Sequence, residues 1–373
     1  MTVITAGTVV LDGRVHRPGW LAVDDGRITD CGSGPVRADA DLGEATVVPG
    51  FVDLHCHGGG GVSYADDPDR AAALHAAHGT TGGLASLVTA DPATLLAQVR
   101  ALADATQRGV VDGIHLEGPW LSGLHCGAHD AALLRDPDRG EVDALLAAAD
   151  GAIRMVTLAP ERPGAIEAIT HLVDAGVVVA VGHTDAGYEA TQAALDAGAT
   201  VGTHLFNAMR ALHHREPGPV AALLADPRVT VELIADGVHL HPAVIEHVVA
   251  TAGPDRVALI TDAMAAAGTG DGAFTLGGLD VDVTGGVARL RGTTTIAGST
   301  ATMDRIFATA VELLGGDGDD ALAAAVRMTS TTPARVLGLD DIGVLRAGSI
   351  ANLVVLNAGL HVERVMRHGI WLM

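Results

Sequence analysis

The chain has 373 residues, of which 48% are hydrophobic, enough to bury the core of one large domain with a small appendage. Acidic residues outnumber basic residues by 45 to 23, and the resulting net charge of −22 argues against nucleic acids and anionic membranes as partners. The three cysteines (Cys31, Cys56 and Cys126) are too few, and odd in number, for a disulfide framework, which predicts a reducing, cytoplasmic location.

The first ten residues lack the basic start of a signal peptide, and Asp12 interrupts the apolar run that they begin. No apolar stretch reaches the roughly 18 residues that a membrane-spanning helix needs. We therefore expect neither a signal peptide nor a membrane span.

Both ends of the chain are predicted to be β-rich. Short apolar runs occupy residues 1–46, where Asp24-Asp25-Gly26 is typical of a hairpin turn. Residues 343–373 repeat this pattern, with apolar runs at 349–356 and 362–366. Because two similar ends surround a different middle, we predict a small β-sandwich domain that is built from both termini.

The middle of the chain, residues 47–342, alternates between short apolar runs and alanine-rich helical segments. Apolar strands separated by helices predict a parallel sheet that helices cover. Eight such units indicate an α/β protein with a (β/α)₈ TIM-like barrel, interrupted by a glycine-rich β insertion near 270–296 that could lend strands to the small domain. The expected strands are 47–54, 82–88, 111–116, 153–158, 177–181, 200–203, 229–235 and 257–261, and the expected helices are 68–78, 92–108, 141–149, 164–175, 188–197, 217–225 and 242–251. Residues 315–320 are predicted to form a flexible loop.

Candidate metal ligands follow these strands. His55 and His57 alternate along the end of the first expected strand, so their side chains share one face. In a barrel, the C-terminal ends of all strands meet at one rim, where active sites lie. Burying several ionisable groups together is costly unless a cation compensates, so the set predicts metal-dependent catalysis. The other members of the set are Glu117, His183, His204 and Asp262.

This pattern resembles the amidohydrolase superfamily, in which a His-x-His pair follows strand one, single histidines follow strands five and six, and an aspartate follows strand eight. Longer strings, spread over nearly the whole chain, resemble the family of N-acetylglucosamine-6-phosphate deacetylases. The resemblance implies metal-dependent hydrolysis of the acetamide of N-acetylglucosamine 6-phosphate, a linear amide, in amino-sugar catabolism and cell-wall sugar recycling. The strings include His115-Leu-Glu-Gly-Pro119, Gly182-His183-Thr-Asp-Ala186, His204-Leu-Phe-Asn-Ala-Met209, Arg215-Glu-Pro-Gly218 and Asp236-Gly-Val-His239.

The resemblance also implies a ligand set. Several amidohydrolases bridge two metals with a carboxylated lysine, but this chain has no lysine, so Glu117 is the expected bridging carboxylate. Glu117, His183 and His204 would hold the principal ion, and His55 and His57 would hold a second one. One or two divalent ions per subunit are therefore expected, with zinc as the first choice and iron, cobalt and manganese left open.

The remaining site residues take their expected roles from the same resemblance. Asp262 would be the general acid and base, and His129 or the metal would stabilise the oxyanion. A homodimer is implied, in which Arg215 reaches the substrate phosphate in the neighbouring site; a surface ion pair with Glu216 is the alternative for this arginine. The implied substrate contacts are Ala128, His129, Asn207, Ala208, Arg215, His239, Ala297, Gly298 and Ser299.

Two other functions stay open at this point: an amidohydrolase that acts on another N-acyl amino sugar or a cyclic amide, and a non-catalytic sugar-phosphate sensor. Cys126 either lines a mobile lid or fills a small apolar space. Four histidines on expected helices are predicted to be ordinary surface or helix-face residues, namely His75, His78, His171 and His247.

Overall fold

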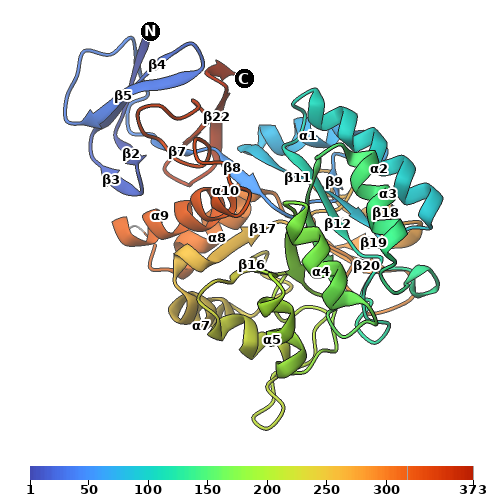
Figure 1. Cartoon of the computed structure of the whole chain (residues 1–373). Helices are drawn as coiled ribbons and strands as arrows, with labels where there is room; N and C mark the ends of the chain where they lie inside the picture. Colours follow the sequence, from blue (N-terminus) through green and yellow to red (C-terminus); the bar gives the residue numbers. More distant parts are fainter. Residues whose placement is uncertain (317, 373) are drawn as a thin grey trace.

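A computed structural model describes residues 1–316 and 318–372. Its centre is an eight-stranded parallel sheet with the strand order β17-β16-β15-β14-β13-β12-β11-β8, which curls into the expected TIM-like barrel (Figure 1). This confirms the predicted fold class. The barrel strands are β8 (Phe51–Asp53), β11 (Thr80–Val88), β12 (Gly113–Glu117), β13 (Ile153–Leu158), β14 (Val178–Val181), β15 (Val201–Gly202), β16 (Thr230–Ile234) and β17 (Val257–Ile260).

The barrel closes between its first and last strands just beyond their C-terminal ends. Cys56 and Ala263 form a parallel bridge there, and the Asp262 N–H donates to the carbonyl oxygen of His55 at 2.8 Å. The His57 N–H donates to the carbonyl oxygen of Ala263, also at 2.8 Å. Closure of the barrel therefore places the His-x-His segment beside Asp262, which lies about 200 residues later in the chain.

Helices cover the outside of the barrel, and each of the seven expected ones is present within a few residues of its predicted bounds. Aspartates cap several of them, as in α1, where the Asp67 side chain accepts from the Arg70 N–H. The sequence analysis did not name the later helices. The helices are α1 (Pro68–Ala77), α2 (Pro92–Gln107), α3 (Arg139–Ala149), α4 (Ala165–Asp174), α5 (Tyr188–Asp196), α6 (Gly218–Ala225), α7 (Pro242–Ala252), α8 (Met303–Leu313), α9 (Asp319–Val326) and α10 (Thr332–Val336), with 3₁₀ turns η1 (Ala131–Leu133) and η2 (Pro254–Arg256) and a π-helical turn η3 (Arg327–Thr331).

Strands from the two chain ends share one mixed sheet, with the order β23-β22-β21-β7-β2-β3, beside a four-stranded sheet with the order β5-β4-β1-β6. Figure 1 shows the first strands (blue) and the last strands (red) side by side, next to α9. Apolar residues from both ends, such as Ile4, Leu21 and Leu353, form one core cluster here. The strands are β1 (Thr2–Ala6), β2 (Thr8–Leu11), β3 (Arg14–His16), β4 (Gly19–Asp24), β5 (Arg27–Ser33), β6 (Ala40–Asp41), β7 (Thr46–Pro49), β21 (Leu353–Leu356), β22 (Val362–Arg367) and β23 (Ile370–Trp371).

The expected single strand 47–54 is two strands in the structure. Residues of β7 pair with β21 in the terminal sheet, whereas β8 pairs with β11 in the barrel. Gly50 separates them, and a Cβ atom at this position would lie 2.0 Å from Oγ1 of Thr81. Only glycine fits this close approach, so an apolar run that looks continuous in the sequence serves two sheets.

Two further expectations need correction. The insertion forms a separate three-stranded sheet, β18 (Gly272–Leu276), β19 (Leu279–Thr284) and β20 (Val287–Leu290), and does not extend the terminal sheets. Its apolar face packs on Met264 and Ala297 instead, next to the barrel rim.

The expected loop 315–320 overlaps the start of α9 at Asp319, and residue 317 within it lies outside the described residues. Two short strands, β9 (Gly58–Gly59) and β10 (Val62–Ser63), also lie near the rim. Across the described ranges, we find no helix with the length and apolar character needed to cross a bilayer.

Candidate active site

The carboxylate of Glu117, at the end of β12, is the centre of the barrel rim. Its Oε1 atom lies 3.0 Å from Nε2 of His183 and 2.9 Å from Nε2 of His204. The two imidazole Nε2 atoms are themselves 3.1 Å apart, and all three side chains are buried. The structure thus brings together the three residues that the sequence analysis assigned to the principal metal ion.

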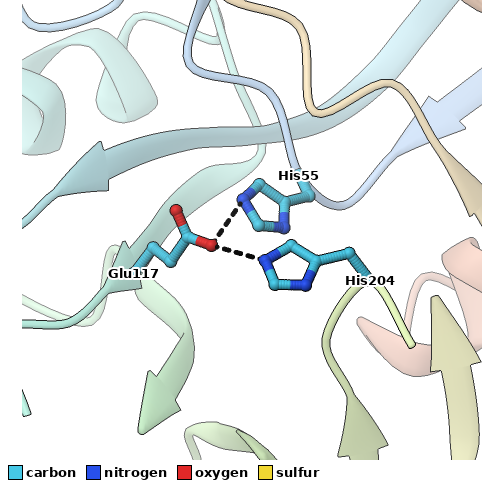
Figure 2. A group of neighbouring side chains, drawn as sticks. All are labelled: His55, Glu117 and His204. Carbon is cyan, nitrogen blue, oxygen red and sulfur yellow. Dashed lines mark hydrogen bonds and ion pairs between the residues drawn. The ribbon is translucent and has the colours of Figure 1, made fainter. Parts of the chain in front are cut away.

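The His-x-His pair lies against the same carboxylate. Nε2 of His55 is 3.4 Å from Oε1 of Glu117, and Nε2 of His57 is 3.2 Å from Oε2. Figure 2 shows the Glu117 carboxylate pointing toward the rings of His55 and His204. Both oxygens of Glu117 therefore face histidines from different strand ends, an arrangement in which one carboxylate can serve two ions.

Hydrogen bonds to the outer ring nitrogens orient three of these histidines. Nδ1 of His183 donates to the carbonyl oxygen of His125 at 2.9 Å, and Nδ1 of His57 donates to that of Ser86 at 3.3 Å. Nδ1 of His55 donates to Oε2 of Glu232 at 3.3 Å. Since each acceptor retains the proton on Nδ1, the Nε2 lone pair is free to bind an ion at the centre. This donor set fits a divalent metal.

The electrostatics of the rim lead to the same conclusion. Burial raises the pKa of Glu117, but the imidazoles of His55 and His183 outweigh it and lower this pKa well below its usual range. Burial likewise lowers the pKa of His57, yet Asp262 and Glu117 overcome this and raise it to about 8. Glu117 and Asp262 thus favour the charged forms of His55 and His57, and a divalent cation could take the place of those protons.

Asp262 adds a second carboxylate to the rim. Its Oδ1 atom lies 3.3 Å from Nε2 of His57 and 3.6 Å from Nε2 of His55. Burial raises its pKa, but the two histidines lower it to about 2, so the group is ionised at neutral pH. The backbone at Asp262 has a φ of 48°, and the Ser299 N–H donates to its carbonyl oxygen at 2.7 Å. The ionised carboxylate is thereby held beside the candidate metal ligands.

His129 has the opposite tautomer from the candidate ligands. Its Nδ1 accepts a hydrogen bond from the Thr89 N–H at 3.2 Å, so the proton of the neutral ring is on Nε2. That Nε2 lies 3.2 Å from Oε2 of Glu117. Burial lowers the pKa of His129 to about 4, which keeps the ring neutral. His129 therefore presents an N–H donor to the centre, as an oxyanion donor requires.

A cavity of about 400 Å³ opens above the rim. The residues on its wall come from several barrel loops and include six of the nine expected substrate contacts and a residue of the inserted sheet, Leu276. Those expected contacts are Ala128, His129, Asn207, Ala208, His239 and Gly298.

Three expected substrate contacts lie elsewhere. Ala297 and Ser299 are buried behind the wall, where the Ser299 hydroxyl donates to the carbonyl oxygen of Thr261 at 2.5 Å. Arg215 is exposed on a loop outside the cavity lining, and its Nη1 lies 2.7 Å from Nε2 of His214. The alternative partner of this arginine, Glu216, is not the group that it contacts.

Cys126 is partly exposed in the loop that carries His125 and Gly127, both of which line the cavity.

Two residues that support the site were not singled out from the sequence. Glu232 is fully buried in β16, where it orients His55 and accepts from the His204 N–H at 3.3 Å. His115, in β12, is fully buried with its ring centroid 4.5 Å from that of His55. A charged residue inside an otherwise apolar strand was the available signal for Glu232.

The prediction of a surface position for His75 was wrong, because this side chain is buried and its Nε2 lies 2.9 Å from the carbonyl oxygen of Gly58.

The barrel and its rim of histidines and carboxylates are typical of the metal-dependent barrel enzymes, and comparison with known proteins identifies the family. A sequence model of the amidohydrolase family matches residues 46–372. N-acetylgalactosamine-6-phosphate deacetylase of Escherichia coli O157:H7 is 40% identical over 368 residues, which cover 94% of this chain and 95% of that protein. N-acetylglucosamine-6-phosphate deacetylase of Vibrio furnissii is 37% identical over 346 residues, 90% of this chain and 85% of that protein.

Solved structures agree with these sequence relatives. One is an aspartate-to-alanine mutant of N-acetyl-D-glucosamine-6-phosphate deacetylase from Mycobacterium smegmatis, in complex with N-acetyl-D-glucosamine-6-phosphate. It is 57% identical, with a TM-score of 0.97 over 99% of this chain and 98% of its own. The chain therefore belongs to the amidohydrolase family, which confirms the resemblance drawn from its motifs.

Proposed function

We propose that the protein hydrolyses the acetamide of N-acetylglucosamine 6-phosphate to acetate and glucosamine 6-phosphate. The observation that carries this proposal is the convergence of Glu117, His183 and His204 within 3.1 Å of one another, beside an ionised Asp262. Relatives from Vibrio furnissii and Mycobacterium smegmatis carry this activity in their names. N-acetylgalactosamine 6-phosphate is a second candidate substrate, because the Escherichia coli relative is named for it.

The candidate ligands divide into two groups around one carboxylate. Glu117, His183 and His204 would hold the principal ion, and His55 and His57 would hold a second ion beside the same carboxylate. An ion there would acidify water and polarise the amide carbonyl. Imidazole and carboxylate suit zinc, and they also suit iron, cobalt or manganese.

The residues of the chain supply the proton transfers and the oxyanion donor. Asp262, ionised and facing the centre, would accept the proton of the attacking water and then deliver it to the departing amino group. The Nε2–H of His129 would donate to the carbonyl oxygen as negative charge develops on it. His239, on the cavity wall, would contact the sugar; its Nδ1 is held by Asp236 at 2.7 Å.

A second copy of the chain is proposed to supply the arginine that recognises the substrate phosphate. Arg215 is exposed on its loop and lies outside the cavity of its own chain. Leu124, Leu212 and Val238 are large apolar residues that are exposed near the cavity mouth and its adjoining loops. A homodimer would cover these side chains and bring Arg215 to the phosphate in the partner site, where its guanidinium can form two parallel hydrogen bonds.

We also propose the division of the chain into a small β domain (1–46 and 343–373) and a barrel (47–342), with the insertion on the barrel. The mixed sheet of N-terminal and C-terminal strands supports this division. The free thiols of Cys31, Cys56 and Cys126 support a cytoplasmic location.

The direct test is acetate release from three substrates: N-acetylglucosamine 6-phosphate, N-acetylgalactosamine 6-phosphate and unphosphorylated N-acetylglucosamine. We expect the highest kcat/KM on the first substrate, because Arg215 and the relatives indicate a phosphorylated glucosamine. Treatment with a chelator should abolish acetate release, and zinc should restore it, since the rim residues fit a divalent ion. Equal rates on all three substrates would contradict the substrate assignment, and full activity after verified metal removal would contradict the metal dependence.

The Arg215→Ala variant is expected to raise KM for the phosphorylated substrate by about 10- to 100-fold, the cost of losing a charge-assisted hydrogen bond, and to leave the unphosphorylated sugar unaffected. Arg228→Ala is the matched control, since Arg228 is an exposed arginine that pairs with Asp226 at 2.6 Å. Steady-state kinetics on both substrates measures the difference.

Mixing the variants Arg215→Ala and Asp262→Asn, at a concentration of the phosphorylated substrate so low that each variant alone is nearly inactive, tests whether Arg215 acts on the partner site. A mixed dimer would contain one site with an intact Asp262 and an intact arginine from the other subunit, so activity should return after subunit exchange. If the mixture stays as inactive as its components while both variants are dimeric, Arg215 does not act across an interface.

A further inference from the structure

A cleft of about 450 Å³ lies on the opposite side of the fold from the metal rim, between the β2–β3 turn, the turn η3 with helix α10, and residues 339–346. Four of its eleven lining residues are arginines, in a chain with 23 arginines among 373 residues. They are Arg14, Arg327, Arg335 and Arg346, against two acidic lining residues, Asp12 and Asp340. The lining is thus positive by two charges, whereas the whole chain has a net charge of −22.

The arginines of this cleft are only weakly paired with carboxylates, although Arg335 and Arg346 donate to the backbone carbonyl oxygens of Asp255 and Asp340. Arg346 lies 3.8 Å from Asp12, and Arg327 lies 3.9 Å from Asp255. Nε of Arg327 is buried and has no hydrogen-bond partner among the described residues. Over the same part of the chain, neither Arg14 nor Arg335 has a carboxylate oxygen within 4.0 Å.

Some exposed arginines outside the cleft are paired closely, whereas others, such as Arg37 and Arg100, have no carboxylate oxygen within 4.0 Å among the described residues. Arg291 lies 2.8 Å from Asp280, Arg108 lies 2.9 Å from Asp69, and Arg228 lies 2.6 Å from Asp226. Acidic groups outnumber basic ones almost two to one in this chain, so carboxylates are abundant. Four loosely paired arginines around one cleft therefore leave positive charge and N–H donors that an anion can use.

The cleft is preformed by tight backbone packing. The Thr331 hydroxyl donates to the carbonyl oxygen of Gly343 at 2.8 Å. A Cβ atom at residue 343 would lie 2.4 Å from the carbonyl oxygen of Ser330, so only glycine allows this wall to approach η3. The turn η3 is π-helical, a conformation that occurs frequently at functional sites. A ligand would meet arginines that are already positioned, with little cost of ordering.

We propose that this arginine cleft is a second anion site that binds a small phosphorylated metabolite through its phosphate group. Guanidinium groups bind phosphate oxygens in pairs, and the volume lies within the range of small-molecule pockets. A ligand here would contact the first β strands and the helix under the barrel at once, and would stabilise their association. The proposal goes beyond the deacetylase function and does not depend on it.

The test is titration calorimetry of the zinc-loaded full chain with glucose 6-phosphate, a phosphorylated hexose without an amide. Each wild-type chain should bind one more molecule of glucose 6-phosphate than the double variant Arg14→Gln with Arg335→Gln. The deacetylase kcat of this double variant should equal that of the wild type. Arg37→Gln, an exposed arginine outside the cleft, is the control and should keep the wild-type stoichiometry. The single variant Arg14→Gln, which removes no hydrogen bond of the described chain, should weaken the extra site by about 10- to 100-fold.

Several outcomes would overturn the proposal. The wild type and the double variant could bind the same number of equivalents, or Arg37→Gln could lose the extra equivalent as well. The two lysine substitutions, Arg14→Lys with Arg335→Lys, provide a further check: they retain the charge and should retain weaker binding, whereas complete loss would contradict an electrostatic site. Loss of acetate release in the wild type would bear on the proposed function alone, because this binding is measured without turnover.

Discussion

Replacing Asp262 by asparagine is expected to lower kcat by about 10² to 10⁴, the usual contribution of a positioned general acid or base. The Asp262 carboxylate has a pKa of about 2 and faces His57 and His55, so it is an available base at neutral pH. An asparagine amide has nearly the same shape but accepts no proton. Its oxygen can still approach an ion, so the metal content per chain should stay at the wild-type level.

Asp150→Asn is a matched control for this change. Asp150 follows α3 with a φ of 47°, close to the 48° of Asp262, and asparagine tolerates this left-handed conformation well. The control therefore separates the loss of the carboxylate from any effect of the backbone conformation. Near wild-type kcat in Asp262→Asn, with normal metal content, would show that another group transfers the proton.

The second large effect is expected for Glu117→Gln, measured as metal content and as activity. Among the residues that the structure describes, Glu117 is the one carboxylate that lies within 3.4 Å of His55, His57, His183 and His204. Without this carboxylate, the site loses the negative charge that offsets the charge of a cation, and the new amide would place an N–H group against an Nε2 atom. The affinity for the metal should fall by about 10- to 100-fold, so that less metal stays bound after dialysis. Activity at low zinc concentration should fall in parallel.

Glu167→Gln, on the exposed side of α4, is the control for Glu117→Gln and should keep full metal content. Elemental analysis gives the metal content, and thermal unfolding shows whether the variant remains folded. A folded Glu117→Gln protein with wild-type metal content and activity would exclude Glu117 as a ligand. The metal assignment would then have to rest on His55, His57 and Asp262, whose ligand atoms also lie close together.

Much of the fold could be predicted because its signals are local. Alternating apolar runs and alanine-rich segments predicted the barrel, and proline or aspartate at helix starts located α1, α2 and α7 within about two residues. The expected site residues were found for a related reason, since histidines and acids directly after apolar strands must gather at one rim. Their roles remain predictions, to be decided by the variants above.

Other features could not be predicted, because they depend on contacts between distant segments. The run 47–54 is apolar throughout, and only the approach of Thr81 to Gly50 divides it between two sheets. The burial of His75 depends on packing against the Gly58 carbonyl group, which its helical surroundings in the sequence do not reveal.

The sequence by itself determined the parallel barrel, the terminal β strands and the identity of the residues at the strand ends, because strand and helix periodicity and strand-end position are properties of neighbouring residues. The tertiary structure alone decided which ring nitrogen of each histidine carries the proton: Glu232 keeps it on Nδ1 of His55, and Thr89 places it on Nε2 of His129. It also decided that Arg215 lies outside its own cavity and that four arginines share a cleft. These features arise from hydrogen bonds and charges between segments that meet only when the barrel closes.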